Sequence, residues 1–132
     1  MSHKLGVVLV ACCITSLTLG CFDANDQFIQ GTWYFRDPHL ESVSGETYLE
    51  AYWTFNRGGF EFYTCCFAGE IHQTGRYRIL KSTENVLDIE LFNVKGTGTG
   101  DRGAMRLVIS READTLLIQG GGPFERVLPG SR

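Results

Sequence analysis

Two adjacent cysteines, Cys65 and Cys66, lie close in sequence to Glu70 and His72, and such side chains can hold a metal ion or take part in redox chemistry. Neighbouring residues of a β-strand point to opposite faces, so the two sulfurs are poorly placed to share one ion. We therefore expect free or buried thiols and no metal site. A vicinal disulfide, which needs a strained turn, and a link to another chain stay open as alternatives. His39 and His72 are interpreted as surface residues.

A glycine-rich stretch, GTGTGDRG at residues 96–103, invites comparison with phosphate-binding loops. It lacks the Lys-Ser/Thr pair of a P-loop and the helix that should follow, so we interpret it as a hairpin loop. No Ser/His/Asp set or paired carboxylate stands out, because acids such as Asp88 and Glu90 alternate outward on a predicted strand. We therefore predict a protein that is not an enzyme and that uses no cofactor.

The composition is that of one ordinary folded domain. The chain has 132 residues, of which 43% are hydrophobic and 20% are charged, a size suited to a single core. Its formal net charge is -3, and no basic face is evident. This balance argues against a nucleic-acid partner.

Residues 1–20 have the pattern of a secretory signal, with a positive start and an uncharged apolar run at residues 5–19 before Cys21. The run is shorter than the roughly 20 residues of a membrane-spanning helix. This end of the chain resembles bacterial lipoprotein signals, in which diacylglycerol is attached to the cysteine thiol. The resemblance implies a lipid anchor at Cys21, labelled by palmitate, with Cys12 as the alternative position. An unmodified structural thiol at Cys21 also stays open. Because Phe22 follows the cysteine, the resemblance implies the outer rather than the inner membrane.

After a tether at residues 21–27, residues 28–132 are expected to form the folded domain. Its short segments alternate apolar and polar residues, the period of half-buried strands, and none shows a sustained helical stripe. Eight strands are expected at residues 31–36, 47–55, 60–67, 71–80, 86–92, 104–111, 115–119 and 124–128. Short connections favour antiparallel neighbours, and closing the meander removes its two exposed edges. We therefore predict an all-β, eight-stranded, antiparallel up-and-down barrel.

The segment FIQGTWYF, residues 28–35, resembles the opening of the lipocalins and their calycin relatives through Gly31-x-Trp33 at the entrance to the first strand. The resemblance implies that Trp33 closes the barrel bottom beneath a basic residue near the last strand, a part that Arg126 fits. Its guanidinium would stack on the indole face. Gly31 would let the chain pass close under the barrel, and Trp33 would supply a large apolar plug. The chain is shorter than typical lipocalins, so we expect a short lipocalin-like domain.

Bulky side chains are expected in the barrel interior, as core or as the lining of a small apolar cavity for a ligand. The candidates are Trp53, Phe55, Phe60, Phe62, Tyr77 and Met105. Core is the interpretation that we favour. Any surviving cavity should open at the end opposite Trp33.

A second resemblance lies in Ser44-Gly45-Glu46-Thr47-Tyr48. The pattern S-G-x-x-Y resembles the loop with which periplasmic inhibitors of C-type lysozymes enter the lysozyme cleft, and an acidic surface would suit a basic target. The family's second conserved segment and its disulfide between distant cysteines are not found here. Three hypotheses follow: a membrane-anchored lipocalin-like protein of the bacterial envelope that binds a small apolar ligand or a partner protein, a lysozyme inhibitor acting through Ser44, Gly45 and Tyr48, and a structural envelope lipoprotein.

Overall fold

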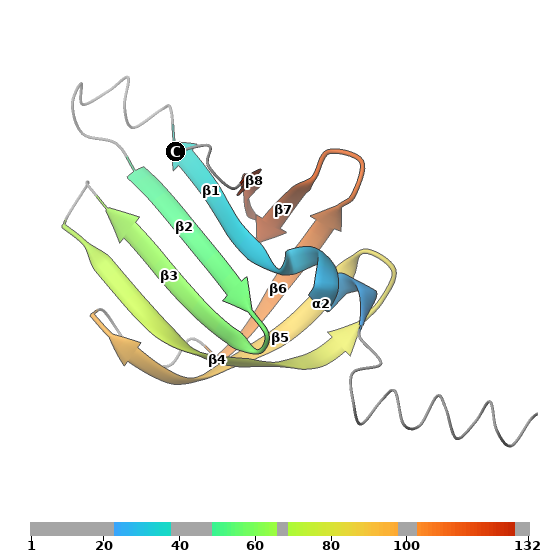
Figure 1. Cartoon of the computed structure of the whole chain (residues 1–132), viewed down its shortest axis with the longest axis horizontal. Coiled ribbons are helices and arrows are strands. Elements are labelled where there is room, and N and C mark those ends of the chain that lie inside the picture. Colours follow the sequence, from blue (N-terminus) through green and yellow to red (C-terminus); the bar gives the residue numbers. More distant parts are fainter. Residues whose placement is uncertain (1–22, 38–48, 66–68, 98–102, 129–132) are drawn as a thin grey trace, which may run out of the picture.

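The computed structural model describes residues 23–37, 49–65, 69–97 and 103–128. Within these ranges eight antiparallel strands form a closed barrel, in which each strand pairs with its neighbours in sequence and β1 also pairs with β8 (Figure 1). The strands are β1 Gly31–Asp37, β2 Leu49–Asn56, β3 Gly59–Cys65, β4 Ile71–Ser82, β5 Val86–Gly96, β6 Gly103–Ser110, β7 Thr115–Ile118 and β8 Gly121–Val127. The predicted fold class is confirmed.

Alternation along the strands separates the core from the surface. On β5 the side chains of Leu87, Ile89 and Leu91 are buried, and on β6 Leu107 and Ile109 are buried in the same way. The residues between them are partly or fully exposed, so each strand presents one apolar face to the barrel interior, as the period of two predicts. The barrel is therefore held together from the inside by a continuous apolar core.

The longest strands, β4 and β5, extend beyond the predicted ends at residues 80 and 92. Their pairing shifts between Thr74 and Arg76, which places Gly75 at an irregularity. A Cβ atom at Gly75 would lie 2.7 Å from the Phe60 ring, so glycine is needed for the ring to pack there. Glycine and a bulge let the paired strands bend around the barrel without breaking their ladder.

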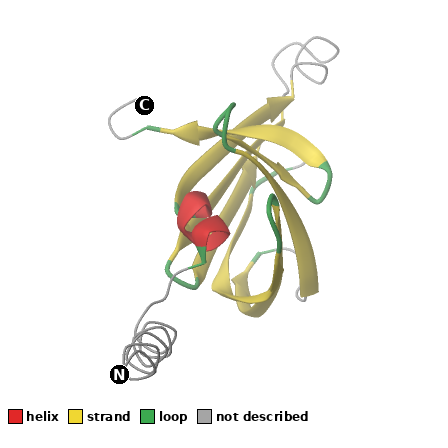
Figure 2. Cartoon of the chain, turned by 90° about the vertical axis from the view of Figure 1, so that its right-hand side faces the viewer, coloured by secondary structure: helices red, strands yellow, loops and turns green. Residues whose placement is uncertain are grey.

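A helix, α2 (Ala24–Ile29), occupies part of the segment that was expected to be a tether. The Asp23 side chain caps it by accepting hydrogen bonds from the backbone N–H groups of Asn25 and Asp26. Asn25 and Ile29 are buried, so the helix packs against the barrel. Figure 2 shows this helix against one end of the barrel. The tether interpretation is wrong from Ala24 onward, because a six-residue helix has too few turns to show an apolar stripe.

Candidate functional site

Trp33 lies where α2 meets the barrel; its side chain is fully buried and donates from Nε1 to the Ile29 carbonyl at 2.8 Å. The Arg126 guanidinium lies over the indole, with Cζ 4.3 Å from the ring centroid. Gly31 has a φ of 117°, a conformation that other residues rarely adopt. A Cβ atom there would lie 3.4 Å from Arg126 Nη1. The expected stacking of Arg126 on Trp33 is present.

Arg126 also ties the helix to the barrel. Its two terminal nitrogens donate to the carbonyls of Gln30 and Phe28 at 2.9 and 2.8 Å, and Nε lies 3.0 Å from the Asp114 carboxylate. One side chain thus joins β8, the β6–β7 turn and the chain around the end of α2. These contacts give Arg126 a structural role at this end of the barrel.

The six side chains proposed as a ligand-binding interior are all buried, with at most 9% of any one exposed to solvent. Trp53 lies 4.5 to 5.9 Å, centroid to centroid, from the rings of Phe55, Phe60 and Phe62. The Tyr77 ring meets Phe55 edge-on at 5.6 Å. Ring contacts this close show that these side chains pack against one another in the core. These residues, with Met105, belong to the core cluster.

The Tyr77 hydroxyl is fixed where α2 meets the barrel. It donates to Asp26 Oδ1 at 2.6 Å and accepts from Gln30 Nε2 at 2.9 Å. Burial and the hydrogen bond to the Asp26 carboxylate raise the pKa of Tyr77 to about 12. The Tyr77 hydroxyl therefore anchors α2 to the barrel.

Two other predicted sites fall outside the described residues. Cys21 and the alternative Cys12 are among residues 1–22, and Ser44, Gly45 and Tyr48 lie between Asp37 of β1 and Leu49 of β2. His39 also lies outside them.

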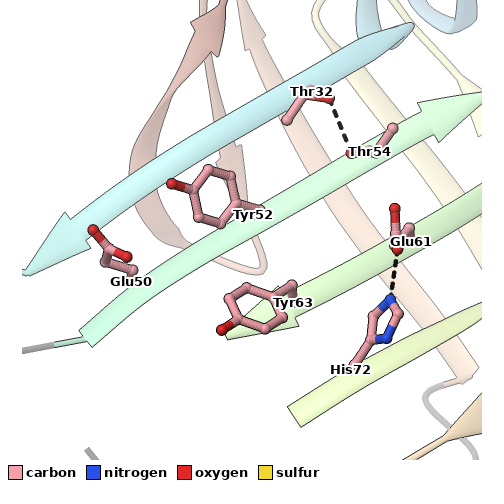
Figure 3. A pocket seen from close by; sticks show the side chains of 7 residues that line it. All are labelled: Thr32, Glu50, Tyr52, Thr54, Glu61, Tyr63 and His72. Carbon is pink, nitrogen blue, oxygen red and sulfur yellow. Dashed lines mark hydrogen bonds and ion pairs between the residues drawn. The ribbon is translucent and has the colours of Figure 1, made fainter. Parts of the chain in front are cut away.

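The outer face of the sheet carries a hollow of about 520 Å³ that sequence analysis did not anticipate. Its lining side chains come from β1 to β4 and point away from the core, as Figure 3 shows. They are Thr32, Glu50, Tyr52, Thr54, Glu61, Tyr63 and His72. We call this surface the outer tyrosine face, and include Tyr34, which contacts Tyr52.

Strand register creates the outer tyrosine face. Tyr34 pairs with Tyr52, Tyr52 with Tyr63, and Tyr63 with His72, so four rings stand side by side across four strands. Successive ring centroids are 4.9, 6.2 and 6.3 Å apart. Cross-strand aromatic neighbours stabilise a sheet and form a rigid, amphipathic surface.

Carboxylates accept hydrogen bonds along this row. The Tyr34 hydroxyl donates to Glu50 Oε1 at 2.9 Å, and the Tyr63 hydroxyl donates to Glu70 Oε1 at 3.2 Å. Burial and the Glu50 hydrogen bond raise the pKa of Tyr34 to about 12. The pKa of Tyr63 is also raised, through desolvation and the bond to Glu70. Both phenols therefore stay neutral donors at any physiological pH.

His72 is exposed, as expected, with 54% of its side chain accessible to solvent, and its Nε2 lies 2.5 Å from Glu61 Oε2 (Figure 3). Within the described ranges, no group of three or more His, Cys, Asp or Glu side chains is placed to hold a metal ion. No helix among those residues is long and apolar enough to cross a bilayer.

Cys65 is disulfide-bonded, so the expectation of a free thiol is wrong at this position. Its Sγ lies 4.0 Å from Glu50 Oε2, at the edge of the outer tyrosine face.

Comparison of the chain with known protein families, curated proteins and solved structures gave no match.

Proposed function

We propose that this chain is a membrane-anchored, non-catalytic, lipocalin-like lipoprotein of the bacterial cell envelope that binds a partner protein on the outside of its barrel. The observation that supports this choice over a small apolar ligand is the contrast between the two faces of β2 and β3. Inward, Trp53 and Phe62 pack against each other. Outward, Tyr52 and Tyr63 line an open hollow. Partly exposed aromatic rings with polar tips, as here, are typical of protein-binding surfaces.

Organic extraction of the purified protein followed by mass spectrometry tests whether the barrel interior holds a small apolar ligand. We expect an empty extract, because the interior side chains already contact one another. A stoichiometric apolar molecule in the extract would favour the ligand-binding hypothesis instead. A Phe62→Ala variant provides a positive control, since a residual cavity in a buried apolar core can admit a small apolar probe.

Metabolic labelling with palmitate tests the anchor. We expect label in the wild type and in Cys12→Ala and none in Cys21→Ala, because the lipid is proposed to sit on the Cys21 thiol. Equal labelling of the wild type and Cys21→Ala would refute the assignment. Loss of label in Cys12→Ala alone would move it to the alternative position.

Inhibition of C-type lysozyme is the second candidate function. The segment that holds Ser44, Gly45 and Tyr48 joins the ends of β1 and β2, the two strands that carry Tyr34 and Tyr52. The loop and the outer tyrosine face could therefore contact one partner together. Unchanged lysis by C-type lysozyme in the presence of excess protein would remove this candidate. Inhibition that is lost in Tyr48→Ala would establish it.

A further inference from the structure

We infer that the outer tyrosine face binds a basic segment of a protein partner, an extended stretch of chain bearing Arg or Lys side chains. This inference rests on the proposed function, in which the partner binds outside the barrel. It adds the chemistry of the partner, which the described side chains supply.

Carboxylates supply the charge complementarity. Glu50 and Glu61 line the hollow itself. Glu70 reaches Tyr63 at one end of the row, and Glu125 of β8 is the register partner of Tyr34 at the other. These four carboxylates surround a row of neutral phenols, so the local field favours a cation.

Positive groups near this surface lie mainly at its edge. Arg36 is the register partner of Glu50 on β1. Lys95 pairs with Thr74, and Arg76 follows on β4, beyond the His72 end of the row. Arg36 offsets part of the charge of Glu50, while Glu61, Glu70 and Glu125 leave the outer tyrosine face with an excess of negative charge.

The rings match the same partner. A guanidinium or ammonium group placed over a tyrosine face gains from the ring quadrupole, and a carboxylate beside the ring can complete an ion pair. The molecule already contains a comparable contact, because Arg78 lies over Phe92 at 4.4 Å while its Nε bonds Glu90 at 2.6 Å.

The geometry favours this occupant over two others. A glycan would stack best on parallel rings, but neighbouring rings in the row are inclined by 43°, 47° and 71°. A second copy of the chain joined through this face would place carboxylates against carboxylates, which costs free energy.

Fluorescence anisotropy with a labelled, end-blocked (Gly-Arg)4 peptide tests the inference on the full chain. We expect saturable binding that weakens as salt is raised, because the ion pairs lie at a solvent-exposed surface. A (Gly-Glu)4 peptide of equal length should not bind. Absence of saturable (Gly-Arg)4 binding at low salt would overturn the inference.

Matched variants locate the site. Glu61→Gln removes a carboxylate that lines the hollow, and Glu112→Gln removes one from the exposed β6–β7 turn. Both change the net charge equally. We expect Glu61→Gln to weaken (Gly-Arg)4 binding roughly fivefold, the scale of one exposed ion pair, while Glu112→Gln leaves it unchanged. Equal effects of the two variants would show attraction to net charge and overturn the inference. Tyr52→Ala should weaken binding further, with circular dichroism confirming its fold.

Other occupants give different results. Saturable binding of an N-acetylglucosamine oligomer that Tyr52→Ala abolishes would assign the face to a glycan. A concentration-dependent dimer that Tyr52→Ala dissociates would assign it to a second copy. Either result would overturn the basic-segment inference. An apolar molecule in the organic extract would contradict the proposed function, whereas the peptide assay reports on the face independently.

Discussion

At the scale of single residues, a few polar side chains with several partners each connect parts of the chain that are far apart in sequence. Arg126 bonds two backbone carbonyls, pairs with Asp114 and covers Trp33. Its side chain is only 23% exposed, whereas the Arg106 side chain, which pairs with Asp88, is 63% exposed. The same ion-pair chemistry should therefore contribute very differently to the free energy of unfolding at these two positions.

Replacing Arg126 by alanine should lower the free energy of unfolding by about 2–4 kcal/mol, because it leaves two carbonyls without their donor and uncovers the indole. Arg106→Ala is the control and should cost less than about 1 kcal/mol, because its pair is exposed. Urea unfolding of both variants measures the difference. A similar loss of stability in both would show that Arg126 contributes only a surface ion pair.

Tyr77 gives a pH dependence of known sign. Its folded pKa of about 12 lies above the ordinary value of 10.0, so the folded state keeps the proton between these two values while the unfolded state loses it. The stabilisation is complete below about pH 10 and is lost as the pH rises through about 12. Ultraviolet titration should show a late-ionising phenol that is missing in Tyr77→Phe. Melting temperature should also fall less steeply with pH in that variant. If the late ionisation persisted in Tyr77→Phe, it would belong to another phenol, and Tyr34 is the next candidate.

At the scale of elements, α2 acts as a structural part of the barrel end. Asn25, only 3% exposed, donates from Nδ2 to Ser82 Oγ and the Thr83 carbonyl and accepts from Arg111. The helix is thereby joined to the β4–β5 and β6–β7 turns. Because the Asn25 amide is itself buried, its hydrogen bonds to these turns are the ones that hold α2 in place.

An Asn25→Ala variant should lose about 2–3 kcal/mol of stability and should release α2 before the barrel unfolds. Gln27→Ala, on the exposed side of the same helix, should have little effect. Hydrogen exchange resolved along the chain measures both. Equal protection of residues 24–29 in the two variants would contradict the role given to Asn25.

The elements also show what sequence patterns can predict. Strong alternation, as in Leu87, Ile89 and Leu91, predicted the position and inner face of β5 correctly. Alternation along β2 also turns Tyr52 outward, but alternation alone could not reveal a row of rings. That row depends on register, which the turn between Asn56 and Gly59 sets for β2 and β3. Combining the outward positions of the tyrosines with the register of each hairpin would have indicated the outer tyrosine face.

At the scale of the whole molecule, closure of the sheet into a barrel gives its two faces different environments. The inner face carries the apolar core, in which Trp53, Phe55 and Tyr77 pack together. Polar groups and tyrosine rings on the outer face remain accessible over β1 to β4. Function is therefore expected on the outside, and an exterior change such as Glu61→Gln should alter binding without changing the melting temperature.

The seam of the barrel joins residues 32–34 of β1 to residues 125–127 of β8. The edge of β1 that faces β8 therefore has no partner until the chain through residue 127 is present. Contacts this distant in sequence slow folding and leave an edge exposed to wrong pairing.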